Sequence, residues 1–193
     1  MKNLLSKRLA EAAALQQAVM RESALLQTVA DVGEKLVQCY RAGGKVWFAG
    51  NGGSAAEAQH LAAELSGRFY YDRAPLFSEA LHVNTSYLTA VANDYGYEWV
   101  FSRLIAANGS SGDILVGLST SGNSVNIVKA FEVARERGVI TVGMTGQGGG
   151  KMAALSDSLI AVPSTDTPRI QEIHLILGHL LCEYVESQLF PRG

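Results

Sequence analysis

Five side chains able to bind a metal or transfer a proton lie in two stretches of this sequence. His60 and Glu64 are four residues apart, which places them on one face of a helix. Gln171 and His174 are three apart, and Gln171 and His179 are eight apart, so they also lie on roughly one side of a helix. Imidazoles and carboxylates are ordinary zinc ligands, whereas a glutamine oxygen is an unusual one. Such spacings also arise by chance on helices, and spacing leaves open whether His174 binds a metal or faces the core.

A second polar cluster, Ser119-Thr120-Ser121-Gly122-Asn123-Ser124, has the composition of an anion-binding loop. It follows an apolar stretch typical of a buried strand and precedes a predicted helix, whose N-terminus offers free N–H groups and a positive dipole end. Gly122 allows the backbone to approach an anion closely. Capping of the helix would need one hydroxyl, and the loop has four. We therefore predict a phosphate-binding loop built from neutral donors.

The other unusual loop is Gly50-Asn51-Gly52-Gly53-Ser54. It resembles a dinucleotide-binding turn, but it lacks the full glycine spacing and the acidic residue after a second strand. We predict a tight strand-to-helix turn with Ser54 as the N-cap and backbone amides facing a substrate.

These residues need a scaffold, and the rest of the chain alternates between strand and helix patterns. Predicted strands cover 45–50, 76–83, 113–118, 139–145 and 159–163. Predicted helices follow Ser54 and cover 86–107, interrupted around 93–96, then 124–138 and 168–189. Alternation of this kind predicts an α/β fold with a parallel five-stranded sheet covered by helices on both faces.

In the flavodoxin-like strand order, the first and third strands are neighbours where the order reverses, and ligands bind at that edge. The loops that follow these two strands are Gly50–Ser54 and Ser119–Ser124. We therefore expect both loops to line one site.

The first 42 residues are rich in Ala, Leu, Gln and Glu and contain no proline, which predicts helix. We expect one break near Arg21–Ser23, giving an N-terminal helical hairpin ahead of the sheet. An apolar face that includes Leu4, Leu5 and Leu9 is typical of a helix that packs against a partner subunit. The whole chain, residues 1–193, is predicted to be a single domain, with residues 1–42 used in oligomerisation.

Composition excludes several classes of protein. The chain has 193 residues, 48% hydrophobic residues and a formal net charge of -2, which suits a globular domain and gives no basic excess for nucleic acid. Two distant cysteines, Cys39 and Cys182, indicate a reducing compartment. With neither a signal peptide nor a membrane-spanning run apparent, we expect a soluble cytoplasmic protein.

Four segments carry a family resemblance: AGNGGSAAEAQHLAAELSGRF, VANDYGYEWVFSR, LVGLSTSGNSVNIVKAF and DTPRIQEIHLILGHLLCEYVE. They closely resemble the phosphoheptose isomerases of the SIS (sugar isomerase) family, over most of the chain from Gly44 onward. The resemblance implies a flavodoxin-like SIS domain, a homotetramer and active sites between subunits. It also implies conversion of sedoheptulose 7-phosphate to D-glycero-D-manno-heptose 7-phosphate, the first step towards the heptose of bacterial lipopolysaccharide.

The resemblance also implies roles for individual residues. Glu64 and His179 match the catalytic acid–base pair. The zinc set, with one ion per subunit, matches His60, Glu64, Gln171 and His179, whereas His174 matches no metal position. The substrate contacts match Asn51, Gly52, Gly53, Glu64, Asn93, Asp94, Ser119, Thr120, Ser121, Ser124 and Gln171.

Three alternatives compete with this interpretation. A non-catalytic SIS protein that binds the bacterial replication initiator shares both loops, but it lacks the equivalents of Glu64 and His179, which are present here. A sugar-phosphate sensing module would usually carry a DNA-binding domain, and no such region is evident. An isomerase of another sugar phosphate stays open, because the motifs separate sugar chain lengths poorly.

Overall fold

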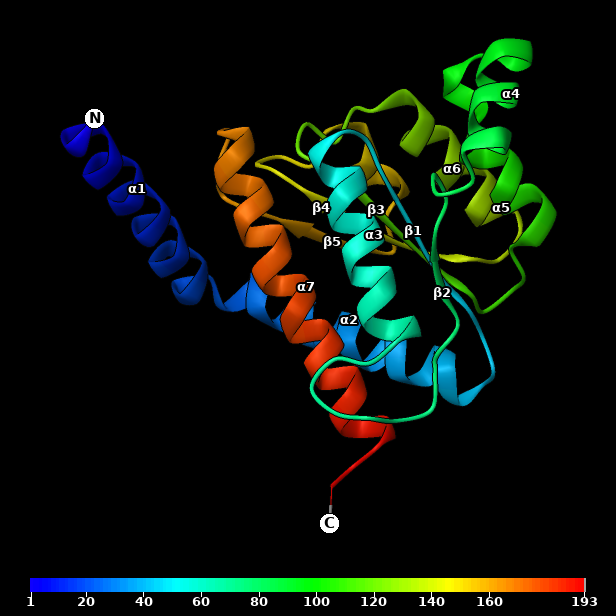
Figure 1. Ribbon diagram of the computed structural model, residues 1–193, viewed down its shortest axis with the longest axis horizontal. Coiled ribbons are helices and arrows are strands. Elements are labelled where there is room, and N and C mark those ends of the chain that lie inside the picture. Colours follow the sequence, from blue (N-terminus) through cyan, green and yellow to red (C-terminus); the bar gives the residue numbers. More distant parts are fainter. Residues whose placement is uncertain (193) are drawn as a thin grey trace.

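The computed structural model describes residues 1–192 and contains one five-stranded sheet flanked by helices (Figure 1). The strands are β1 (Val46–Gly50), β2 (Ser78–Ala80), β3 (Ile114–Ser119), β4 (Ile140–Thr145) and β5 (Ser158–Ala161). The α-helices are α1 (Lys2–Arg21), α2 (Ser23–Arg41), α3 (Gly53–Ser66), α4 (Thr85–Tyr95), α5 (Ser102–Asn108), α6 (Val125–Glu136) and α7 (Thr167–Leu189). Two 3-10 helices, η1 (Tyr97–Trp99) and η2 (Gly150–Leu155), complete the list for the described chain.

All strands are parallel and follow the order β2-β1-β3-β4-β5, which is the predicted flavodoxin-like order. Successive strand residues point to opposite faces and are buried on both. On β1, Phe48 joins a core formed with α2, α3 and α7, whereas Trp47 joins the core on the side of α4, α5 and α6. The predicted three-layer α/β fold is confirmed.

The boundaries differ from the prediction mainly at the sheet edge. Residues 76–83 were predicted as a strand, but β2 contains only Ser78–Ala80. β2 pairs with β1 alone, through Val46, Trp47 and Phe48, and the ladder ends where the chain turns at Leu81 and His82. The residues predicted as a broken helix over 86–107 form α4, η1 and α5.

The two N-terminal helices meet at Glu22, inside the predicted break. α2 packs against α7 and β5 and buries six residues, among them Val32 and Leu36. α1 buries only Val19 and extends away from the body of the molecule instead of lying along α2 (Figure 1). None of the helices described over residues 1–192 is both long enough and apolar enough to cross a membrane.

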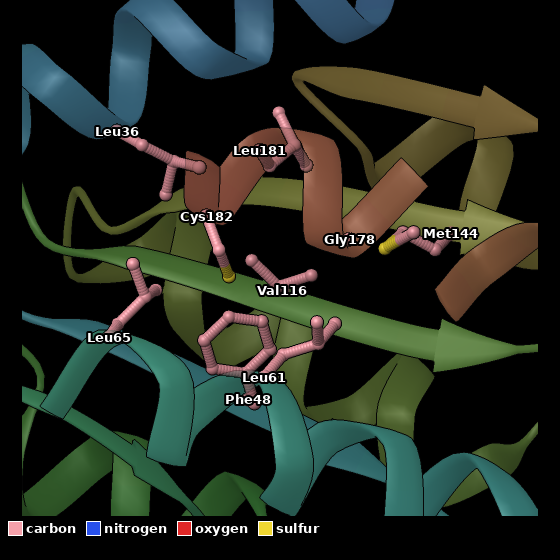
Figure 2. Close-up of a pocket in the computed structure, with 9 residues that line it drawn as sticks. All are labelled: Leu36, Phe48, Leu61, Leu65, Val116, Met144, Gly178, Leu181 and Cys182. Atoms are coloured by element: carbon pink, nitrogen blue, oxygen red, sulfur yellow. The ribbon is translucent and has the colours of Figure 1, made fainter. Parts of the chain in front are cut away.

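Helices α3 and α7 cross the same face of the sheet and touch closely at Gly178. A Cβ atom at Gly178 would lie 2.6 Å from the methyl carbons of Leu61, so only glycine permits this contact. Figure 2 shows Leu61 and Gly178 at the small apolar void between the two helices and the sheet, with Phe48 and Val116. Because Leu61 follows His60 and Gly178 precedes His179, this packing brings the two histidines together.

Candidate functional site

The loops after β1 and β3 lie side by side, as predicted. Gly50 at the end of β1 pairs with Leu118 of β3, at the point where the strand order reverses. A cleft of about 260 Å³ lies over this point, near the lower end of the range for small-ligand pockets. It is lined by Asn51, Gly53, Ser54, Leu118, Ser119, Thr120, Ser121, Ser124, Thr167 and Gln171.

The hydroxyls of the predicted phosphate loop are not used as helix caps. Ser124 is the N-cap of α6, but its side chain accepts no backbone N–H. Its hydroxyl instead bonds the hydroxyl of Ser119, with 2.8 Å between the two oxygens. The first-turn N–H groups of α6 are thereby left without a hydroxyl acceptor, which favours an anion there over simple capping.

A glycine-rich segment, residues 146–150, holds this loop in shape. Gly122 has φ +65°, and a Cβ there would lie 2.0 Å from the carbonyl oxygen of Gly149. The Gly146 N–H donates to the Thr120 carbonyl at 3.0 Å, and the Met152 N–H donates to the Gly122 carbonyl at 3.0 Å. Residues 146–150 follow β4 directly and consist of four glycines and one glutamine. The support that this segment gives to the phosphate loop depends on a contact between two distant loops, which no local sequence pattern predicts.

The predicted metal ligands His60, Glu64 and His179 converge. The Nε2 atoms of His60 and His179 are 2.8 Å apart, and Glu64 Oε1 is 3.5 Å from His60 Nε2. One ligand atom from each residue lies within 4.8 Å of the others. Two imidazoles and a carboxylate directed at one point fit a divalent ion such as zinc.

Gln171, the fourth predicted ligand, lies two turns before His179 on α7, a rise of about 12 Å. It lines the cleft beside the phosphate loop, packs against Gly53 and donates from Nε2 to Ser54 Oγ at 3.4 Å. The structure thus places Gln171 at the phosphate-loop cleft, against Gly53 and Ser54, away from the histidine cluster.

His174, which spacing left open, belongs to the core. Its side chain is fully buried, and Nε2 lies 3.1 Å from the carbonyl oxygen of Thr145 at the end of β4. Burial lowers the pKa of His174 to about 4, only partly offset by the bond to Thr145, so the ring is neutral at physiological pH.

Asn93 and Asp94 are exposed at the end of α4, and their side chains bond each other, with Asn93 Nδ2 donating to Asp94 Oδ1 at 2.9 Å. Neither residue lines the cleft. Nearby Tyr97 does approach the site, because its hydroxyl donates to Asn51 Oδ1 at 3.1 Å. Gly52 has φ +56° with open space around it, and it is not among the residues that line the cleft.

Sequence reasoning missed three residues around the site. The prediction of Ser54 as the N-cap of α3 was also wrong, because the cap is Gly52; Ser54 is buried in the first turn, accepts from Gln171 and lines the cleft, as expected for its loop. Thr167, at the start of α7, lines the cleft opposite Thr120. Asn126 and Tyr97 contact Asn51. Polar residues in the first turn after each loop were the available signal, but only the fold shows which of them face inward.

Comparison with known proteins agrees with this geometry. The model of the SIS domain family matches residues 9–146. The phosphoheptose isomerase of Aneurinibacillus thermoaerophilus is 52% identical over 176 residues, covering 91% of this chain and 89% of that protein. That of Rhodospirillum rubrum is 59% identical over 161 residues, covering 83% and 86%.

Solved structures give the same result. The phosphoheptose isomerase of Neisseria gonorrhoeae superposes with a TM-score of 0.90 at 41% identity, covering 96% of this chain and 98% of that one. A phosphoheptose isomerase from Francisella tularensis superposes with a TM-score of 0.89 at 33% identity, covering 97% and 100%. This chain belongs to the SIS domain family and, within it, to the phosphoheptose isomerases.

Proposed function

We propose that this protein interconverts sedoheptulose 7-phosphate and D-glycero-D-manno-heptose 7-phosphate in the cytoplasm, supplying heptose for lipopolysaccharide. The observation that carries the proposal is the convergence of His60, Glu64 and His179 on two helices that also reach the phosphate-loop cleft. Along α3, Ser54 and His60 are six residues apart, about 9 Å of rise. An extended seven-carbon sugar phosphate can span that distance, with its phosphate on Ser119–Ser124 and its carbonyl end at the histidines.

The isomerisation moves one proton between C1 and C2 through an enediol(ate). We assign Glu64 as the base that removes the proton from C1 and returns it at C2, and His179 as the acid that protonates the C2 oxygen. The O1 hydroxyl then gives its proton to His179, which lost one to the C2 oxygen, so both residues return to their starting states and atoms and charge balance. Glu64 Oε1 faces His60, which leaves Oε2 for proton transfer.

His60, Glu64 and His179 would hold a zinc ion, with Gln171 approaching from the cleft side. When bound, such an ion polarises the carbonyl and stabilises the enediolate oxygen. The remaining contacts fix the substrate: Ser119, Thr120, Ser121 and Ser124 for the phosphate, Asn51 beside them in the same cleft, and Gly52, Gly53, Asn93, Asp94 and Gln171 for the sugar. We include Asn93 and Asp94 because active sites between subunits would allow them to reach a neighbouring cleft.

The direct test incubates the purified protein with sedoheptulose 7-phosphate and follows aldose formation. We expect a chelator to lower turnover at least about tenfold and added zinc to restore it. Changes at the residues around a metal already cost about 10–100-fold in activity, and a chelator removes the metal itself. A matched incubation with a pentose phosphate tests chain length. Absence of product with and without zinc would contradict the proposal and favour a sugar-phosphate binding protein.

We further propose that the chain is one domain that assembles as a homotetramer through α1. Leu4, Leu5 and Leu9 are 55%, 55% and 71% exposed on a helix that leaves the body of the molecule. Burying such a face is favourable by about 25 cal/mol per Å². Changing these leucines to glutamine should lower the mass measured by light scattering towards that of a monomer. The matched surface change Lys7→Gln should leave the mass unchanged, and an unchanged mass for the leucine variant would contradict the role of α1.

A further inference from the structure

Asn126 and Asn51 bond each other in both directions through their side-chain amides. Asn51 Nδ2 donates to Asn126 Oδ1, and Asn126 Nδ2 donates to Asn51 Oδ1, each at 2.9 Å. Asn126 is 4% exposed and lies in the first turn of α6, directly behind the phosphate loop. The pair therefore joins the loop after β1 to the helix that follows β3.

A backbone N–H group fixes which way the two side-chain amides face. The backbone N–H of Ile127 donates to Asn126 Oδ1 at 3.0 Å, sharing this bond with the Ser124 carbonyl. Because a backbone N–H is only a donor, the oxygen of Asn126 must face it, and the Asn126 amide nitrogen must then face Asn51. Asn51 consequently turns its own oxygen towards Asn126.

Tyr97 completes the arrangement. Its hydroxyl donates to Asn51 Oδ1 at 3.1 Å, so this oxygen accepts two hydrogen bonds and has no lone pair left. One N–H of Asn51 is used by Asn126, and the second N–H is its remaining polar group. Asn51 lines the cleft together with Ser119 and Ser124, so the group it offers there is a donor.

We propose that Asn126 and Tyr97 are positioning residues that fix the amide of Asn51 as a hydrogen-bond donor to the substrate phosphate. This inference rests on the proposed function for the identity of the substrate, but the phosphate contact stands apart from catalysis. The cleft lining contains no Lys or Arg, so its donors to a phosphate are neutral, and a correctly turned amide adds one donor to the hydroxyls of the loop.

The test compares Asn126→Ala and Tyr97→Phe with the wild-type protein. Asn126→Ala should raise KM for sedoheptulose 7-phosphate about tenfold with kcat within about twofold, since a contact made equally in ground and transition states changes KM alone. Tyr97→Phe should act in the same direction, by about threefold. Asn126→Asp retains the acceptor for the Ile127 N–H and keeps a residue favoured at a helix N-terminus, so it should fold normally yet bind phosphate more weakly still.

Titration with inorganic phosphate in a calorimeter gives a readout independent of turnover. Asn126→Ala should weaken phosphate binding about tenfold, whereas Asn108→Ala, a matched change at the exposed end of α5, should leave it unaltered. Unchanged phosphate affinity in Asn126→Ala, or a fall in kcat without a change in KM, would overturn the inference. A wild type without isomerase activity whose phosphate binding still depends on Asn126 would refute only the proposed function.

Discussion

Changing Glu64 to glutamine, or His179 to glutamine, is expected to abolish turnover while leaving the protein folded. Each change removes one partner of the proposed proton transfer, and general acid or base catalysis contributes roughly 10²–10⁴-fold. The side chain of Glu64 is 24% exposed and that of His179 is half-buried at the surface of α7, so neither supports the core. The measurements are kcat with sedoheptulose 7-phosphate and the thermal melting of each purified variant.

Glu183→Gln is the matched control, because Glu183 is an exposed carboxylate on α7 one turn beyond His179. It should retain wild-type kcat. Near-normal kcat in Glu64→Gln or His179→Gln would contradict the assignment of the acid–base pair. If a variant lost both its activity and its thermal melting transition, the changed residue would be needed for folding as well, which would contradict a purely chemical role.

The second large effect is expected at a buried ion pair next to the site. Glu186 and Arg73 have side chains only 1% and 2% exposed and meet at 3.2 Å. Glu186 also accepts the backbone N–H groups of Phe69 and Tyr70, at 2.9 and 2.8 Å. Arg73 in turn donates to four carbonyl groups around the end of α3, including that of Glu64 at 2.9 Å. The pair therefore fixes the loop that follows α3.

Glu186→Ala should lower the free energy of unfolding by about 3–5 kcal/mol, because it leaves the Arg73 charge buried without its partner. Urea denaturation measures the change, and exposed Glu183→Ala should stay within about 0.5 kcal/mol of wild type. A similar small effect for Glu186→Ala would contradict the structural role of the pair.

The pH dependence of stability should follow the same carboxylate. Burial raises the pKa of Glu186, but the N–H groups of Phe69 and Tyr70 and the Arg73 guanidinium outweigh it and hold the pKa below its usual value. A lowered pKa in the folded state contributes stability that is complete above the pKa of an unfolded glutamate. That stability is lost as pH falls further through the folded value. Glu186→Ala should therefore flatten the acid side of the stability profile.

The sequence was sufficient for the features that follow from local chemistry. Five strands and two unusual loops follow from periodicity and from glycine and hydroxyl residues, and all are present, although β2 is shorter than predicted. The reversal of strand order between the loops follows from the flavodoxin-like order of such a sheet, and it too is present. The pairing of His60 with Glu64 needs only helical geometry.

Features that depend on tertiary contacts could not be predicted in this way. His174 shares a helix face with Gln171, yet α7 packs so closely on the sheet that this part of the face lies against the end of β4. The bonds from Asn126 and Tyr97 to Asn51 join three elements across up to 75 residues of sequence. The support of Gly122 by Gly149 likewise depends on how two loops approach, which no spacing encodes.

The contact between His60 and His179 joins residues 119 positions apart, on the first helix after β1 and on α7. During synthesis from the N-terminus, the ribosome produces the phosphate loop and Glu64 long before the residue proposed to act with Glu64 exists. If His179 has the proposed role, a nascent or prematurely terminated chain that lacks α7 cannot isomerise the sugar phosphate, however much of the sheet it has formed. Isomerase activity in this protein would therefore report that the entire sheet and its last helix have assembled.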